Sequence, residues 1–127
     1  MAKTKQYTIT LDNKPGAVAE IVKTLGSAKV NILGLLAWAE GPTGTLQLIV
    51  EDSKRAKKAL DDARVSYKEQ TTEQIELANK PGALSKTLEQ LAKKGVNINH
   101  IYATATKGGK KAVVVYAVAE AAKAATA

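Results

Sequence analysis

Two stretches of this sequence are nearly the same: LDNKPGAV at residues 11–18 and LANKPGAL at residues 77–84. The second follows the first by 66 residues, and at the same offset the triplet VNI at residues 30–32 recurs at residues 96–98. Ten of the 22 positions from 11 to 32 are identical at this spacing. A repeat at a fixed offset is the mark of duplicated structural units. The sequence therefore predicts two homologous domains, residues 1–71 and residues 72–127.

Each element of the first unit follows from its apolar pattern. Alternation from Tyr7 to Leu11 predicts a strand, and apolar residues spaced three and four apart from Val18 to Leu25 predict an amphipathic helix. Pro15 suits the first turn of that helix, where a missing N–H costs nothing. Two strands follow at 32–39 and 46–50, then a helix capped by Asp52-Ser53, then a short closing strand at 65–70.

The order βαββαβ predicts the α+β class. In such a ferredoxin-like unit an antiparallel sheet of strand order 4-1-3-2 carries both helices on one face. The second unit repeats the order with a strand from Gln74, a helix at 83–94 and strands at 98–106 and 112–118. Its second helix would occupy 119–129 and its closing strand would begin at 131, beyond residue 127. We therefore expect a truncated second unit without its last strand. Its first strand, 74–77, would be an unpaired edge, beside which residues 65–70 can lie.

Composition excludes several classes of function. The chain has no cysteine, which rules out disulfides and thiolate sites, and its one histidine, His100, rules out a histidine-rich metal cage. No nucleophile, base and oxyanion donor occur together, so we predict no enzyme, no catalytic residue, no metal and no cofactor. The net charge of +7 invites nucleic-acid binding, but no aromatic residues interleave the basic clusters, so nucleic acid is an unlikely partner. No apolar run is long enough for a membrane span, and the N-terminus is no signal peptide, so we expect a cytoplasmic protein.

The repeated loop between first strand and first helix is the best candidate for a binding site. A helix N-terminus offers unpaired N–H groups and partial positive charge, here near Gly16, and so suits a carboxylate. The side chain of Asn13 has a donor and an acceptor that can hold either charged group of an amino acid. A purely structural alternative stays open, with Asn13 in an Asx turn and Asn31 closing the turn between helix and strand.

These residues resemble the ACT domain, a sensor module of amino-acid metabolism. The pattern is Leu-x-Asn-Lys-Pro-Gly-Ala, a helix, and Val-Asn-Ile at the start of the next strand, present twice in register. The resemblance implies a ligand held between paired domains, touching the loop of one and the start of strand 2 of another. It implies ligand contacts from both repeats: Asn13, Pro15, Gly16, Ala17, Val18, Asn31 and Ile32, and Asn79, Pro81, Gly82, Ala83, Leu84, Asn97 and Ile98. The serine-binding type has a histidine where Leu11 and Leu77 stand, which favours a more apolar ligand here.

The resemblance thus implies a regulatory protein that binds an amino acid and signals by associating with an amino-acid biosynthetic enzyme. We also expect a homodimer, paired through residues 32–39 or 98–106. One alternative is a regulatory subunit that senses no ligand. Another is an RNA-binding ferredoxin-like domain, which would need more aromatic residues on its sheet than this chain has. Near the predicted site, His100 either touches ligand or is an ordinary edge-strand residue, and Trp38 is predicted to anchor a core or an interface.

Overall fold

Six strands and three helices make up residues 2–118, the part of the chain that this computed structural model describes. They are β1 (Ala2–Asp12), α1 (Ala17–Ser27), β2 (Ile32–Glu40), β3 (Thr43–Val50), α2 (Ser53–Asp62), β4 (Lys68–Ala78), α3 (Ala83–Lys93), β5 (Ile98–Ala105) and β6 (Lys111–Val118). The predicted second helix of the second unit, from residue 119 onward, lies outside the described residues. None of the described helices has the length and apolar character needed to cross a membrane.

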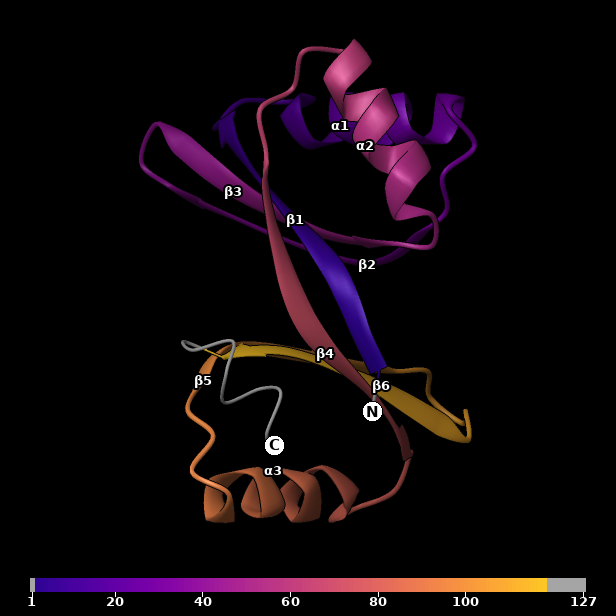
Figure 1. Cartoon of the computed structure of the whole chain (residues 1–127), viewed down its shortest axis with the longest axis vertical. Coiled ribbons are helices and arrows are strands. Elements are labelled where there is room, and N and C mark those ends of the chain that lie inside the picture. The colour runs from indigo at the N-terminus through magenta and orange to yellow at the C-terminus, as the bar shows by residue number, and fades with distance from the viewer. Residues whose placement is uncertain (1, 119–127) are drawn as a thin grey trace. The chain divides into compact units, whose positions relative to one another are not determined.

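The chain divides into two compact units. Residues 5–70 form one, and residues 71–118 together with 2–4 form the other. In the first unit β3 lies between β2 and β1, and an ion pair of 3.4 Å between Lys5 Nζ and Glu69 Oε1 joins β1 to β4. The strand order β2-β3-β1-β4 is the one predicted, and α1 and α2 cover the same face of the sheet (Figure 1). The α+β, ferredoxin-like fold class is confirmed.

The core of the first unit lies between this sheet and its helices. Asp52 begins α2 as its N-cap and accepts a hydrogen bond of 3.0 Å from the backbone N–H of Arg55, as the sequence predicts. Ring edges also pack here, since Tyr7 and Tyr67 meet in a T-shaped pair with centroids 5.5 Å apart. The buried cluster consists of Tyr7, Ile9, Ile21, Leu25, Val30, Leu46, Leu48, Val50, Ala56 and Leu60.

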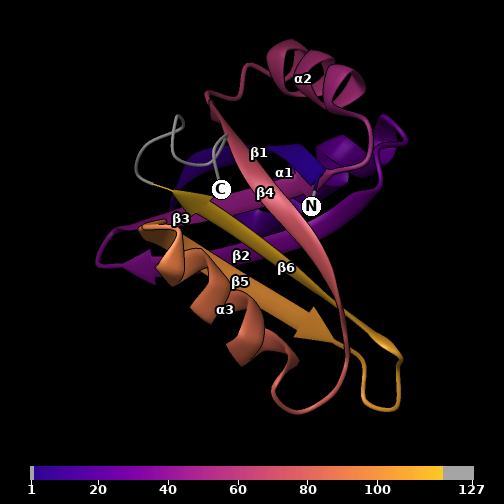
Figure 2. The same ribbon diagram turned by 60° about the horizontal axis from the view of Figure 1, so that its bottom comes forward.

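The second unit repeats the arrangement with one helix in its described part. Here β6 lies between β4 and β5, and α3 packs along this sheet (Figure 2). A smaller core joins Leu91 and Val96 to Tyr116 and Val118. The hydroxyl of Thr72 donates a hydrogen bond of 3.3 Å to the carbonyl of Thr4, so the beginning of β1 lies beside β4 in this unit.

The join between the repeats differs from the prediction. We expected the first unit to close with a strand at 65–70 and the second unit to begin with a separate strand at 74–77. The closing strand was expected to be able to lie beside the strand at 74–77. This is wrong, because Lys68–Ala78 is one continuous strand that ends the first repeat and begins the second. Residues 65–67 lie outside it. The place beside β4 in the second unit, where a last strand was expected to be missing, is taken at Thr72 by the beginning of β1.

Candidate functional site

The loop between β1 and α1 is a tight turn that the sequence dictates. The N–H of Ala17 donates to the carbonyl of Lys14 at 3.3 Å, and Gly16 has φ 87° and ψ −9°. These are the features of a type II turn, which favours proline at its second position and requires positive φ at its third. Pro15 therefore precedes α1, and its predicted place in the first helical turn is wrong. A Cβ at Gly16 would meet nothing within 4 Å, so the glycine is needed for its backbone angle.

The same turn occurs in the second repeat. Ala83 N–H donates to the Lys80 carbonyl at 3.3 Å, and Gly82 has φ 86° and ψ −15°. Backbone N–H groups at the start of α1 stay available, because no hydrogen bond within the described residues uses those of Val18 and Ala19. An anion placed there would meet free donors and the positive end of the helix dipole.

Asn13 joins this loop to the turn between β2 and β3. Its side-chain Nδ2 donates to the carbonyl of Gly41 at 2.9 Å, and its backbone N–H donates to the carbonyl of Pro42 at 2.9 Å. Asn79 does the same in the second repeat, with Nδ2 donating to Gly109 at 2.9 Å and to Thr106 at 3.3 Å. The two asparagines therefore have a structural role, in which their amides hold the neighbouring turns, and their contact with a ligand stays a prediction.

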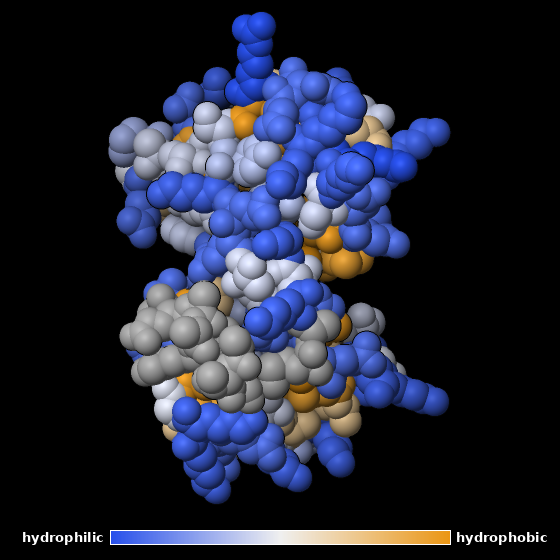
Figure 3. Space-filling view, in the orientation of Figure 1, coloured by the Kyte–Doolittle hydropathy of each residue, from blue (hydrophilic) through white to orange (hydrophobic). Residues whose placement is uncertain are grey.

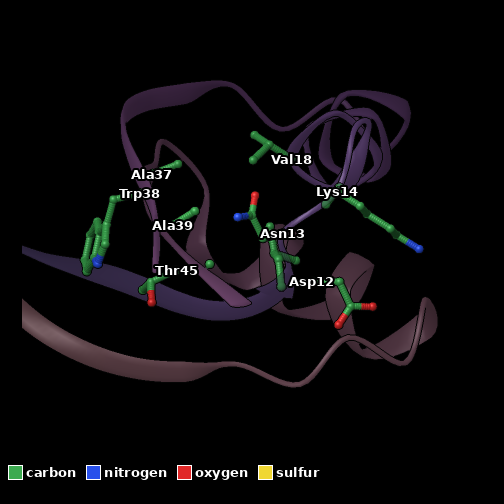
Figure 4. Close-up of a pocket in the computed structure, with 11 residues that line it drawn as sticks. Asp12, Asn13, Lys14, Val18, Ala37, Trp38, Ala39 and Thr45 are labelled. Atoms are coloured by element: carbon green, nitrogen blue, oxygen red, sulfur yellow. The ribbon is translucent and has the colours of Figure 1, made fainter. Parts of the chain in front are cut away.

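A pocket of about 290 Å³ opens beside this junction. Figure 4 shows the Asn13 amide between Val18 and Ala39, while the charged ends of Asp12 and Lys14 point away from the middle. The walls are mostly apolar, and the full lining is Leu11, Asp12, Asn13, Lys14, Ala17, Val18, Ala37, Trp38, Ala39, Gly44 and Thr45. We call this the first pocket.

The second repeat has a pocket in the equivalent place, of about 220 Å³. It is lined by Leu77, Ala78, Asn79, Lys80, Leu84, Ala103, Thr104, Ala105, Ala112 and Val114, and we call it the second pocket. Eight of these residues stand 66 positions after a residue of the first pocket. The duplication in sequence has thus produced two cavities of the same construction.

Comparison with known proteins identifies the family. A family model described as an ACT domain pair matches residues 2–126. The chain belongs to the ACT domain pair family. The repeated Asn-Lys-Pro-Gly loop and the pocket beside it are therefore features of two tandem ACT domains.

Solved structures agree with this assignment. A protein from Bacteroides thetaiotaomicron is 31% identical, with a TM-score of 0.87 over 98% of this chain and 85% of that one. The ligand-free regulatory subunit of aspartate kinase from Thermus thermophilus has a TM-score of 0.68 at 18% identity, over 97% of this chain and 87% of that one, and so shares the fold. No curated protein matches the sequence significantly.

The ACT pockets do not bring together all residues that the sequence predicted for the site. Five of them line the pockets: Asn13, Ala17, Val18, Asn79 and Leu84. Five others shape the loops without lining a pocket: Pro15, Gly16, Pro81, Gly82 and Ala83. Ile32 and Ile98 pack against the cores of their units.

Asn31 lies in a different place from the first pocket. Its Nδ2 donates to Glu51 Oε2 at 3.0 Å, and it lines a polar pocket of about 500 Å³ with Lys29 and Arg55. Asn97 is exposed and has no side-chain hydrogen bond among the described residues. Neither asparagine lines the pocket of its own repeat.

Sequence reasoning missed the wall that β2 and β5 contribute to the ACT pockets. Ala37 and Ala39 face Val18 across the first pocket, and Ala103 and Ala105 occupy the equivalent positions in the second. The predicted topology already indicated this wall. A hairpin between strands 2 and 3 places the end of strand 2 near the beginning of helix 1.

His100 and Trp38 can now be placed. His100 lies on β5 opposite Ala117 and does not line the second pocket, and burial lowers the pKa of its imidazole. Tyr102 follows on the same strand, and burial raises the pKa of its hydroxyl to about 12. Trp38 is 42% exposed at the end of β2 and lines the first pocket on the side away from α1.

Proposed function

We propose that this ACT domain pair is a non-catalytic regulatory protein that binds an amino acid in its two pockets. The observation that carries the proposal is the duplicated pocket beside the Asn-Lys-Pro-Gly loop. A cavity formed twice by the same residues at the same spacing is what a repeated ligand site requires. Membership of a family of paired ACT domains supports the same function.

The chemistry of the first pocket suits an amino acid with an apolar side chain. The ligand carboxylate would lie at the start of α1, where the N–H groups of Val18 and Ala19 have no partner among the described residues. Its side chain would pack against Leu11, Val18 and Ala39. A volume of about 290 Å³ admits a small metabolite of this size.

Asn31 and Asn97 would complete the site from another domain. Each lies at the beginning of an ACT strand 2, away from the pocket of its own repeat. In this arrangement the Asn31 amide would give up its hydrogen bond to Glu51 and would bond to the ligand instead. A hydrogen bond to a charged group is worth roughly 1.5–3 kcal/mol, so Asn31→Ala should weaken binding about tenfold or more.

A second copy of the chain is the proposed source of that other domain. The strands β2 and β5 are the outermost strands of their units, with β3 and β6 on one side of each. Leu33 is 54% exposed and Leu35 43% exposed on β2. On the face that Figure 3 displays, apolar residues, in orange, stand among hydrophilic ones. Pairing between edge strands of two copies would cover Leu33 and Leu35.

The signal would then pass to an enzyme of amino-acid biosynthesis. The Thermus thermophilus protein with the same fold is the regulatory subunit of an aspartate kinase. At 18% identity this shared fold supports a partner enzyme only as a class, and we propose no particular one.

Calorimetric titration of the chain with each of the twenty amino acids tests the ligand. We expect at least one to bind, and Ala37→Leu together with Ala103→Leu to abolish binding by filling both pockets. Ala92→Leu adds the same bulk at an exposed position of α3 and should bind as the original chain does. Equal affinity in the pocket and control variants would disprove the site, and no binding by any amino acid would disprove the function.

Light scattering at micromolar concentration tests the dimer. We expect twice the mass of 13.4 kDa, and a reduced mass for Leu33→Lys, which puts a charge on the β2 edge. The matched change Ala92→Lys should leave the dimer intact. A mass of 13.4 kDa with and without amino acids would contradict the proposed pairing.

A further inference from the structure

The two pockets share their construction but differ in charge. Around the first, Asp12 and Lys14 belong to the lining and Glu40 ends β2, so two acids and one lysine give a net charge of −1. Around the second, Ala78 replaces the aspartate, Lys80 is retained, and the turn at residues 106–111 carries three more lysines. Four lysines give +4 there. The duplicated site has therefore diverged in its electrostatics.

Hydrogen bonds hold this lysine-rich turn at the edge of the second pocket. The backbone N–H of Asn79 donates to the carbonyl of Lys110 at 3.0 Å, and its side chain donates to the carbonyls of Gly109 and Thr106. The turn is also tight, since a Cβ on Gly109 would lie 2.9 Å from the Thr106 oxygen. The lysines thus belong to a segment tied directly to a residue that lines the pocket.

One acid reduces this positive charge without cancelling it. Lys111 Nζ lies 3.8 Å from Glu76 Oε1, and both side chains are about two-thirds exposed. Counting Glu76, the surroundings of the second pocket keep a net charge of +3. The first pocket has no such cluster, because Gly41 and Pro42 form its turn.

The apolar walls also differ between the pockets. Leu84 replaces Val18 and Thr104 replaces Trp38, and the volume falls from about 290 to about 220 Å³. The second pocket thus offers less apolar surface to a large side chain and more positive potential to a charged one.

We propose that the two pockets select different ligands: the first a net-neutral amino acid with an apolar side chain, the second an anionic one with a side-chain carboxylate. This inference rests on the proposed function, since it assigns a ligand class to each of the same two sites. The chain would then respond to two signals, each through one repeat.

The size of the effect follows from long-range electrostatics. The lysines of the turn at residues 106–111 stand outside the lining of the second pocket, and Figure 4 shows the charged ends of Asp12 and Lys14 directed away from the middle of the first. For charges about 8–10 Å away in water, screening is weak at low salt and strong at physiological ionic strength. A net charge of +3 should then raise the affinity for a ligand with one added negative charge about fivefold at low salt, and less than twofold at high salt.

Glutamate and glutamine are the probes, because they have nearly the same shape and differ by one charge. Backbone amide signals of Gly16 and Gly82 in a ¹⁵N-labelled full-length chain report each pocket separately by NMR. We expect glutamate to shift Gly82 at about one-fifth of the concentration that glutamine needs, with the difference lost at high salt. At Gly16 we expect no preference for glutamate.

Charge exchange provides the matched test. The double change Lys107→Glu and Lys110→Glu should remove the preference of the second pocket for glutamate, as reported by Gly82, and should leave the response of Gly16 unchanged. Glu40→Lys should raise the affinity for glutamate in the first pocket alone, as reported by Gly16. Equal preference at both pockets, or no response to the exchanged charges, overturns the inference while binding itself upholds the proposed function. Absence of any shift with all twenty amino acids overturns the proposed function and the inference with it.

Discussion

Replacing Asn13 with alanine removes the amide that joins the β2–β3 turn to the β1–α1 loop. The loss is one hydrogen bond of 2.9 Å to the Gly41 carbonyl, at an exposed site. A neutral hydrogen bond of this kind contributes about 0.5–1.5 kcal/mol to the free energy of unfolding. Asn79→Ala should cost somewhat more, because that amide reaches two carbonyls. Asn13→Asp should cost at least as much as alanine, since a carboxylate has no proton to donate and repels the carbonyl oxygen.

Urea denaturation followed by circular dichroism measures these changes as differences in the free energy of unfolding. Asn97→Ala is the matched control, because that asparagine is exposed and its side chain has no hydrogen bond within residues 2–118; it should change stability by less than about 0.5 kcal/mol. Two results would refute the reasoning: an Asn13→Ala variant that loses no more stability than this control, or an Asn13→Asp variant as stable as the original chain. Either would show that the hydrogen bond from Asn13 to Gly41 does not stabilise the contact between loop and turn.

Three further changes test other parts of the structure. Gly16→Ala should lose about 1–2 kcal/mol in urea denaturation through its left-handed backbone angle, whereas Gly26→Ala inside α1 should gain up to about 1 kcal/mol; equal effects would contradict the strain argument. Asp52→Ala should cost about 0.5–2 kcal/mol by removing the cap of α2, and an unchanged thermal midpoint would show that the cap contributes nothing. Burial lowers the pKa of His100 from 6.5, so on acidification the unfolded chain takes up its proton first, and stability falls as the pH drops through 6.5 toward the lower pKa of the folded state. His100→Gln should flatten this pH dependence, and an unchanged slope would assign it to other groups.

Much of the fold could be predicted because its elements follow local apolar periodicity. The helix at 83–94 and the strands at 98–106 and 112–118 differ from α3, β5 and β6 by one residue at an end. The continuous β4 was missed because polar residues at its centre look like a break between units. No glycine or proline interrupts residues 65–78, however, and Thr71-Thr72 are β-branched residues that favour a strand.

The candidate site was predictable in part. The repeated loop was found because polar residues and a Pro-Gly pair recur in it at fixed spacing. The roles of its residues were harder, because a hydrogen bond such as that from Asn13 to Gly41 joins positions 28 residues apart. The alanines of the opposite wall have no chemical signature in a sequence, and only the paired strands show that Ala37 and Ala39 face the helix.

The strand β4 has a consequence for how such a protein evolves. It completes the sheet of the first unit through Glu69 and starts the sheet of the second at Thr72, which in turn lies beside Thr4 of β1. Recombination therefore cannot transfer either repeat as an intact unit. A cut at the join would divide β4, and it would separate residues 2–4 from the second unit, to which they belong. The two copies differ in their loops, where the second repeat carries three lysines at residues 106–111, but they have the strand β4 in common. Inheritance of the two ACT domains is thereby coupled, whatever the differences between their loops.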